Sequence, residues 1–186
     1  MSRESAAGTL TPQVSDSDHA EGPSSAPVTL VEYGDYECPS CGGAFPIVKT
    51  LQQKMGKEMR FVFRDFPLRE AHPHAVHAAI AAEAVGAHGE KKFWAMHDAL
   101  YEHQDALEDS ELVAYAADLG VSEHEIVNAF EVGAFADRVR ADFRSGVRSG
   151  VNGTPTFFIN GQRYDGDWRD VPAFLSALRA AVEVHA

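Results

Sequence analysis

The apolar residues change their spacing along the first third of the chain. Residues 28–33 form a mostly apolar run, which predicts a buried β-strand. After it, apolar residues recur every three or four positions and predict one face of an α-helix, formed by Phe45, Val48, Leu51 and Met55. A second strand is predicted over 60–66, directly before Pro67. Strand, helix and strand in this order indicate a βαβ unit.

A long middle stretch, from residue 72 to about 149, keeps helical spacing throughout. Its first helix is rich in alanine and ends near Gly86. Ser110 is expected to cap the third helix of the series, and Ser122 with Glu125 forms a capping box for the fourth. Helical spacing explains the aromatic residues of this stretch as core packing. We therefore predict a block of consecutive helices here.

Strand character returns near the end of the chain. Residues 156–159 and 162–164 are strand-like and are joined by Asn160-Gly161, the strongest hairpin signal in the sequence. A final amphipathic helix is predicted from about Asp170. The predicted order is β-α-β, a block of helices, then β-β-α. This order is typical of an α/β fold that carries an all-helical insertion.

The domain organisation follows from composition and from the absence of repeats. Residues 1–26 are rich in Ser, Ala, Gly, Pro and Asp, and we expect them to form a mostly flexible tail. Residues 27–186 show neither an internal repeat nor an interdomain linker. We therefore predict a single domain over 27–186, with the helical insertion at about 72–149.

The charge of the chain excludes some partners. The formal net charge of −12 over 186 residues argues against binding to nucleic acid or to an anionic membrane surface. No run approaches a transmembrane helix in length, and the N-terminus lacks the basic patch and apolar stretch of a secretory signal. We therefore expect a cytoplasmic protein without membrane insertion. No dimerisation segment is evident, so a monomer is expected.

The sequence contains two cysteines, Cys38 and Cys41, in a C-x-x-C arrangement between the first predicted strand and its helix. Residues three apart on a helical turn lie close enough for a disulfide. A cysteine at a helix N-terminus is stabilised as the thiolate by the helix dipole and the exposed N–H groups. Pro39 fits the first helical turn. We predict a redox pair in which Cys38 is the exposed attacking sulfur and Cys41 the resolving one.

Two other interpretations of the cysteine pair stay open. A zinc site would need additional ligands, for which His72, His74 or His77 are the candidates. A purely structural disulfide would close a very short loop and so remove little entropy from the unfolded chain. Otherwise we expect His72 and His74 to be exposed. No nucleotide, flavin or metal motif is present, so we expect no cofactor beyond the cysteine pair itself.

Two acidic residues accompany the pair. Glu32 shares a face of the predicted strand with Val28 and Leu30, and a buried carboxyl there favours its protonated form. It could exchange a proton with Cys41 during catalysis. The alternative is a glutamate of an edge strand in water. Glu37 is expected to be exposed and, as a negative charge, to oppose the thiolate.

Several motifs together resemble a known family, and the resemblance covers nearly everything from about residue 26 onward. The motifs are the stretch from Glu32 to Cys41, which includes Cys38-Pro39-Ser40-Cys41, and then Pro46, Phe66-Pro67-Leu68, Gly153-Thr154-Pro155 and Tyr164-Asp165-Gly166. In order and spacing they resemble the DsbA-like thiol:disulfide oxidoreductases of the thioredoxin superfamily. The resemblance implies a thioredoxin fold with an inserted all-helical subdomain.

The resemblance also assigns roles to residues. It implies a cis bond before Pro155 and a docking site for an extended partner segment at Thr154 and Pro155, with Pro39 and Ser40 as further contacts. An acid at the position of Glu32 is also a feature of the family. The alternative for Gly153-Thr154-Pro155 is a simple turn that enters a strand.

Taken together, these observations predict disulfide exchange with protein or small-molecule thiols. The direction of exchange and the partner that recycles the pair stay open. A glutathione-transferase-like isomerase on the same fold is a second interpretation, although such relatives use a serine in place of Cys38 and lack Cys41. A non-catalytic peptide-binding module is a third.

Overall fold

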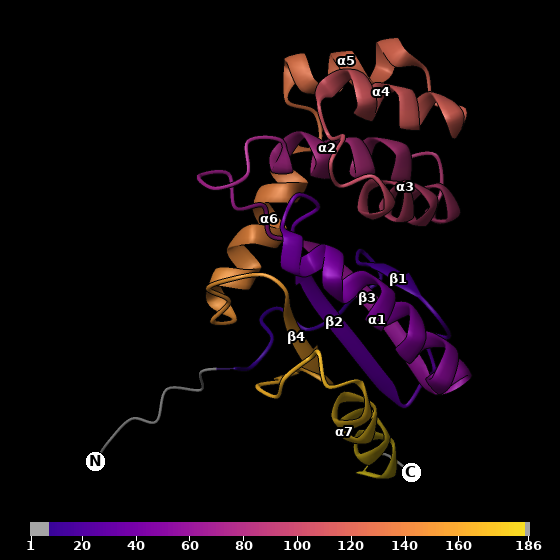
Figure 1. Ribbon diagram of the computed structural model, residues 1–186, viewed down its shortest axis with the longest axis vertical. Helices are drawn as coiled ribbons and strands as arrows, with labels where there is room; N and C mark the ends of the chain where they lie inside the picture. Colours follow the sequence, from indigo (N-terminus) through magenta and orange to yellow (C-terminus); the bar gives the residue numbers. More distant parts are fainter. Residues whose placement is uncertain (1–7, 185–186) are drawn as a thin grey trace. The chain divides into compact units, whose positions relative to one another are not determined.

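The structure is a computed structural model that describes residues 8–184. Within these residues the chain forms five strands and seven α-helices, most of which are labelled in Figure 1. The strands are β1 (His19–Glu21), β2 (Val28–Gly34), β3 (Met59–Asp65), β4 (Thr156–Ile159) and β5 (Gln162–Arg163). The helices are α1 (Pro39–Met55), α2 (Ala75–Gly86), α3 (Glu90–Glu102), α4 (Asp109–Asp118), α5 (Glu123–Val132), α6 (Ala136–Arg148) and α7 (Val171–Val184).

The chain folds as two compact units. The described residues of the first unit are 8–33, 43–64 and 144–184, and those of the second unit are 34–42 and 65–143. The second unit takes in most of the predicted insertion. Helix α1 contributes to both units, because its first residues belong to the second unit and the rest belong to the first.

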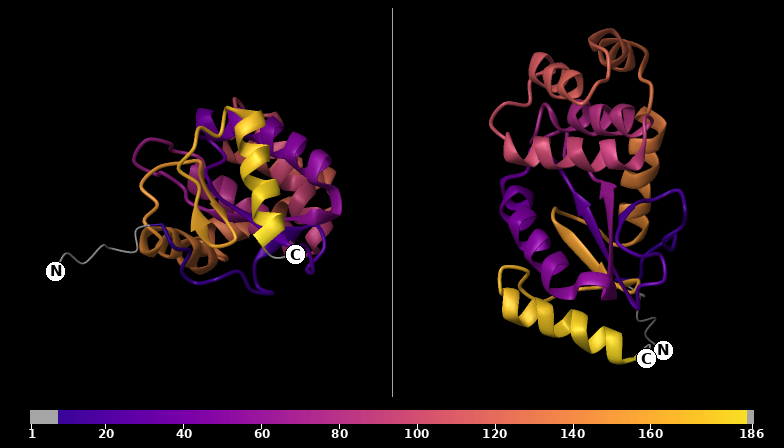
Figure 2. Two further views of the ribbon diagram at one scale, coloured as in Figure 1. Left: turned by 90° about the horizontal axis from the view of Figure 1, so that it is seen from below. Right: turned by 90° about the vertical axis from the view of Figure 1, so that its right-hand side faces the viewer.

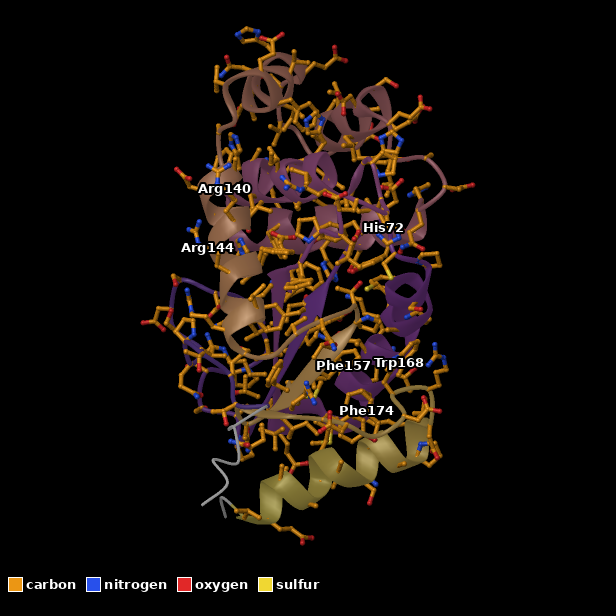
Figure 3. All side chains as sticks on the ribbon, turned by 90° about the vertical axis from the view of Figure 1, so that its left-hand side faces the viewer. His72, Arg140, Arg144, Phe157, Trp168 and Phe174 are labelled. Carbon is orange, nitrogen blue, oxygen red and sulfur yellow. The ribbon has the colours of Figure 1, made fainter. Side chains whose placement is uncertain are left out.

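The first unit is built on a five-stranded sheet with the order β1-β3-β2-β4-β5. Strand β1 runs antiparallel to β3, and β2 runs antiparallel to β4. The register of the latter pair places Leu30 opposite Ile159 and Glu32 opposite Phe157. Helix α7 packs on the hairpin side of this unit, where Phe174 stacks on Tyr164 and meets Phe157 edge to face. Figure 3 labels Phe157 and Phe174.

The predicted hairpin is confirmed. Strands β4 and β5 pair antiparallel, and the turn between them is Asn160-Gly161, with φ of 47° and 81°. Positive φ at both central residues is the type I′ geometry that suits the twist of a hairpin. The Asn160 side chain also accepts a hydrogen bond from the Thr29 N–H at 2.8 Å, which fastens the turn to β2.

The first unit contains a strand that the sequence did not predict. Strand β1 lies within the stretch expected to be a mostly flexible tail, of which residues 1–7 fall outside the described residues. The buried Arg64 of β3 fixes this segment, because its guanidinium makes two hydrogen bonds to Asp18 at 2.8 and 3.1 Å. It also donates to the Pro12 carbonyl and to Tyr33 Oη. Strand pairing and a buried ion pair thus hold in place residues that their composition had predicted to be a flexible tail.

The second unit is a helical assembly in which α2 packs against α3, α4 and α5, as Figures 1 and 2 show. Alanine predominates on α2, and its small side chains are buried. The predicted capping box is confirmed, since Ser122 Oγ accepts the Glu125 N–H at the start of α5. The predicted cap at Ser110 is wrong. Helix α4 begins at Asp109, and Glu108 holds the extended N-cap conformation.

Candidate active site

The two cysteines lie at the junction of β2 and α1, at the start of the helix. Cys38 directly precedes the first helical residue, Pro39, and its carbonyl accepts the Gly42 N–H at 3.1 Å. This hydrogen bond is the first of the helix, so Cys38 occupies the N-cap position. Cys41 lies within the first turn and is fully buried. The predicted position of Cys38 at a helix N-terminus is confirmed, and its ionisation as a thiolate stays a prediction.

The predicted exposure of Cys38 is wrong, because the residue is only 7% exposed. The turn that precedes the helix folds back on itself, and the Cys38 N–H donates to the Asp35 carbonyl at 3.1 Å. Tyr36, inside this turn, is also buried. Its hydroxyl hydrogen-bonds His97 Nδ1 at 3.0 Å, and its ring lies against Tyr101. The turn is therefore part of the packed interior of the second unit.

Asp35 organises this turn through its carboxylate, which is fully buried. Oδ1 accepts the Glu37 N–H at 2.8 Å, an Asx-turn that shapes the approach to Cys38. Oδ2 accepts the Leu68 N–H at 2.8 Å and lies 2.7 Å from His72 Nδ1. We call residues 35–38 the redox turn. The Asp35 carboxylate thus joins the redox turn to the segment that follows β3.

His72 was expected to be exposed, and this prediction is wrong. Its side chain is 18% exposed and is hydrogen-bonded to Asp35. A carboxylate has no proton to donate, so in this pair Nδ1 of His72 carries the proton and Asp35 Oδ2 accepts the hydrogen bond. Burial by itself lowers the pKa of His72, but the Asp35 hydrogen bond and charge, followed by the charges of Cys38 and Glu37, raise it above its ordinary value. Figure 3 labels His72.

Glu37 and His74 form a second link between the same two segments. Glu37 is half-buried, not exposed as predicted, and its Oε2 accepts the His74 N–H at 2.7 Å. His74 is the N-cap residue of α2. Glu37 therefore satisfies an N–H group at a helix N-terminus, where a negative charge is favourable.

Gln104, in the connection between α3 and α4, holds the redox turn from another direction. Its Nε2 donates to the carbonyl oxygens of Tyr36 at 2.8 Å and of Cys38 at 2.7 Å. A Cβ atom at Gly42 would collide with Gln104 Oε1. The absence of a side chain at Gly42 therefore leaves room for the Gln104 side chain. Neither Gln104 nor Asp35 was predicted as a site residue, because most of their partners are distant in the sequence.

Three other predicted site residues, Glu32, Thr154 and Pro155, lie in the first unit, whereas Pro39 and Ser40 belong to the second. Glu32 is 2% exposed on β2, so the alternative of an exposed edge-strand glutamate is wrong. Thr154 and Pro155 are half-buried just before β4, and the peptide bond between them is cis. Pro39 and Ser40 lie between the cysteines and are exposed and half-buried, respectively. The proton-transfer and docking roles of these residues stay predictions.

A buried acidic cluster is present elsewhere in the second unit. Oxygen atoms of Asp65, Glu83 and Asp142 lie within 4.8 Å of one another. Arg138 approaches Glu83 at 3.8 Å and Asp142 at 3.6 Å. Burial, followed by the charges of Glu83 and Asp142, raises the pKa of Asp65 well above its ordinary value. The raised pKa of Asp65 and the nearby guanidinium of Arg138 both act to reduce the negative charge of the cluster.

The zinc alternative gains no support from this geometry. Among residues 8–184, the acidic cluster is the only group of three potential ligands close enough to share an ion, and it contains no cysteine or histidine. The histidines proposed as zinc ligands have other contacts. His72 pairs with Asp35, and His77 Nδ1 lies 2.7 Å from Asp109 while its ring stacks on Phe130.

Residues 14–177 match the sequence profile of a family described as Thioredoxin. The match covers most of the chain, and the chain belongs to this thioredoxin family. The five-stranded sheet with a helical region inserted between β3 and β4 is accordingly the predicted thioredoxin fold, which is confirmed.

Solved structures show the DsbA-like form of this fold. BdbD from Bacillus subtilis superimposes with a TM-score of 0.81 at 23% identity, over 89% of this chain and 93% of that chain. The thiol-disulfide exchange protein alpha-DsbA2 from Wolbachia pipientis gives a TM-score of 0.71 at 22% identity, over 91% and 87% of the two chains. The catalytic domain of ScsC from Proteus mirabilis gives 0.77 at 17% identity, over 94% and 93%.

Curated relatives of higher identity are much longer proteins. Na(+)/H(+) antiporter NhaA 1 of Salinispora arenicola is 42% identical over 173 residues, which are 93% of this chain and 25% of the antiporter. The protein of the same name from Mycobacterium sp. (strain KMS) is 41% identical over 165 residues, 88% of this chain and 26% of that protein. The chain therefore spans about a quarter of the length of these relatives. Within residues 8–184, every helix is too short or too polar to span a lipid bilayer.

Proposed function

We propose that this protein is a thiol–disulfide oxidoreductase that exchanges disulfides with protein substrates through Cys38-Pro39-Ser40-Cys41. One observation carries the proposal: Cys38 occupies the N-cap of α1, and Cys41 lies one turn further along the same helix. A helix N-terminus favours a thiolate, and the thiolate is the reactive form of cysteine. Membership of the thioredoxin family supports the same chemistry.

The exchange moves two electrons between the protein and a partner dithiol. A partner thiolate attacks Cys38 Sγ and forms a mixed disulfide, while the Cys38–Cys41 bond breaks and Cys41 leaves as a thiolate that takes up a proton. The partner's second thiolate then attacks the partner sulfur of the mixed disulfide and releases Cys38 as a thiolate. The partner loses two electrons and the protein gains two. In reverse, Cys38 attacks a partner disulfide and Cys41 resolves the product.

Residues outside the cysteine pair complete the proposal. Glu32 is the group we propose for proton exchange with Cys41, because burial of a carboxyl favours its protonated form. Thr154 and Pro155 are proposed to dock an extended partner segment, with Pro39 and Ser40 as further contacts. The resemblance to DsbA-like proteins supports these assignments. The protein is proposed to act as a cytoplasmic monomer.

The partners are thiols or disulfides of other proteins, or small thiols, with a separate protein that recycles the pair. The antiporter relatives suggest one partner class. In them, a segment similar to this chain shares a polypeptide with an Na(+)/H(+) antiporter. We propose that a membrane cation–proton antiporter is among the proteins with which this domain interacts.

A trapping experiment tests the proposal. Cys41→Ala removes the resolving thiol, so mixed disulfides with Cys38 should accumulate in lysate and dissociate on reduction. The matched control is Cys38→Ala/Cys41→Ala, which should trap none. Mass spectrometry of the trapped proteins also shows whether an antiporter is among them. If the folded Cys41→Ala variant traps no more protein than the control, the exchange mechanism is wrong.

The two alternative functions make different predictions for Cys38→Ser. A glutathione-transferase-like isomerase can work with serine at this position and should keep its activity. A peptide-docking module should keep its affinity for partners. Disulfide exchange should be abolished, because a serine hydroxyl cannot form the mixed disulfide.

A further inference from the structure

The histidine paired with Asp35 is a feature of the second unit that neither the sequence nor the proposed exchange explains. We propose that His72, held by Asp35, is a positioning residue whose imidazolium stabilises the Cys38 thiolate. The proposal rests on the proposed function, because it assigns His72 to the same thiol chemistry. His72 exchanges no electrons and forms no bond with the partner.

Hydrogen bonds fix the position of His72 relative to the redox turn. Asp35 Oδ2 lies 2.7 Å from His72 Nδ1, and the Asp35 carbonyl accepts the Cys38 N–H at 3.1 Å. The backbone N–H of His72 donates to the Leu68 carbonyl, and the backbone N–H of Leu68 donates to Asp35 Oδ2. Asp35 therefore contacts both the histidine and the cysteine backbone. A side chain fixed in this way loses little further freedom when it acts as a counter-charge.

The redox turn is rich in negative charge, which a protonated His72 can offset. The turn carries two carboxylates, those of Asp35 and Glu37, within three residues of Cys38. Negative charges so close to a sulfur oppose its ionisation. A basic side chain reaches this turn from the segment that follows β3. It is His72, whose Nδ1 lies 2.7 Å from Asp35 Oδ2. Its protonation offsets one of the two carboxylates.

The coupling between His72 and Cys38 acts in both directions. The charges that face His72 are those of Asp35, Cys38 and Glu37, and all of them favour the imidazolium. Arg69 and Glu70, on its own segment, pair with each other and are exposed. Because the interaction of two charges is mutual, a thiolate that favours the imidazolium is itself favoured by it.

This coupling has a consequence for the exchange reaction. When the mixed disulfide is resolved by the partner, Cys38 leaves as a thiolate, and a stabilised thiolate is the better leaving group. The electron pair of the broken S–S bond stays on Cys38 Sγ, and the ring of His72 keeps its protons. A stabilised thiolate also stabilises the reduced protein, which makes the pair a stronger oxidant.

The test measures the Cys38 thiolate directly, by its ultraviolet absorbance during a pH titration in the Cys41→Ala background. His72→Gln should move the thiolate titration up by about one pH unit, the low end of what a close opposite charge contributes. His72→Lys, which restores a cation, should return most of that shift. His103→Gln is the matched control, because His103 is an exposed histidine of the second unit bound to the Ala99 carbonyl. Circular dichroism checks that each variant is folded.

A second readout keeps this inference separate from the proposed function. His72→Gln in the chain with both cysteines should shift the glutathione equilibrium towards the protein disulfide by roughly tenfold, the counterpart of one pH unit. If His72→Gln leaves the thiolate titration unchanged, or if His103→Gln moves it equally, the role of His72 is wrong even when the Cys41→Ala trap succeeds. If the titration shifts but no mixed disulfide is trapped, the coupling holds and the proposed function fails.

Discussion

Gln104 donates a hydrogen bond to the Cys38 carbonyl oxygen at 2.7 Å, although 66 residues separate them in the sequence. The same amide group also donates to the Tyr36 carbonyl. The helical region therefore does more than extend the fold, because a side chain from its α3–α4 connection fixes the backbone of the redox turn. This relationship predicts that changes at Gln104 alter the turn without touching a sulfur atom.

Gln104→Leu should destabilise the protein by about 1–2 kcal/mol, because the carbonyl groups of the buried residues Tyr36 and Cys38 each lose one hydrogen bond. The local effect should be larger than the global one. Hydrogen exchange of the Gly42 amide, which donates to Cys38, should become faster. Gln53→Leu, at an exposed position of α1, is the control. Unchanged exchange at Gly42 would show that Gln104 does not hold the turn.

Gly42→Ala should have a similar effect by a different route. The new methyl group would occupy the place of Gln104 Oε1, so the side chain must leave its two carbonyl partners. The effects of Gly42→Ala and Gln104→Ala on the free energy of unfolding should therefore be non-additive, because both remove the same contacts. Denaturant unfolding of the two single variants and the double variant measures this. Strict additivity would contradict the steric explanation.

Arg64→Met should cost about 3–5 kcal/mol of stability, because the buried carboxylate of Asp18 loses its counter-charge. Asp18→Asn combined with Arg64→Met should recover part of this loss. The exposed Arg179→Met is the control. Limited proteolysis should cut before β1 in Arg64→Met sooner than in the unaltered protein, since Arg64 holds residues 12–18. An Arg64→Met variant as stable as the Arg179→Met variant would show that the ion pair does not anchor this segment.

Asp65 should make the protein less stable as the pH rises. Burial and the neighbouring carboxylates raise its pKa in the folded state, so the folded chain keeps a proton that the unfolded chain releases above about pH 4. The contribution of Asp65 to stability is greatest below that pH and is lost as the pH rises through the folded-state pKa. The slope from a single proton is at most about 1.4 kcal/mol per pH unit.

Asp65→Asn keeps a neutral side chain and should remove this component. Its stability relative to the unaltered protein should increase with pH above about 4. Urea unfolding between pH 4 and 8, with a chelator present to exclude cations, measures the difference, and the exposed Asp118→Asn is the control. A constant difference across this range would show that Asp65 does not keep its proton in the folded state.

Local patterns were sufficient to predict most of the elements. The strand before Cys38, the helix after it, the hairpin at Asn160-Gly161 and the capping box at Ser122 all follow from residue spacing and turn chemistry. These features depend on contacts between residues close in the sequence. The error at Ser110 has the same local origin, because Asp109 and Glu111 also favour a helix start through the dipole.

The features that sequence reasoning missed depend on contacts between distant residues. Asp35 and His72 lie 37 residues apart, and nothing in either local pattern indicates their hydrogen bond. Strand β1 could not be predicted because its pairing with β3 and the Arg64 ion pair, not its composition, hold it. The burial of Cys38 likewise results from a turn whose partners come from elsewhere in the chain. Only an acidic residue in the turn before C-x-x-C could have drawn attention to Asp35.

The most direct test of the account is an equilibration of the protein with mixtures of reduced and oxidised glutathione, followed by acid quenching and mass spectrometry. A redox-active Cys38–Cys41 pair should form one disulfide per chain, which forms and breaks reversibly in a single two-electron transition. A midpoint near −120 mV would indicate a strong oxidant and one near −270 mV a reductase. Cysteines that stay reduced or stay oxidised at every glutathione ratio would contradict the central claim.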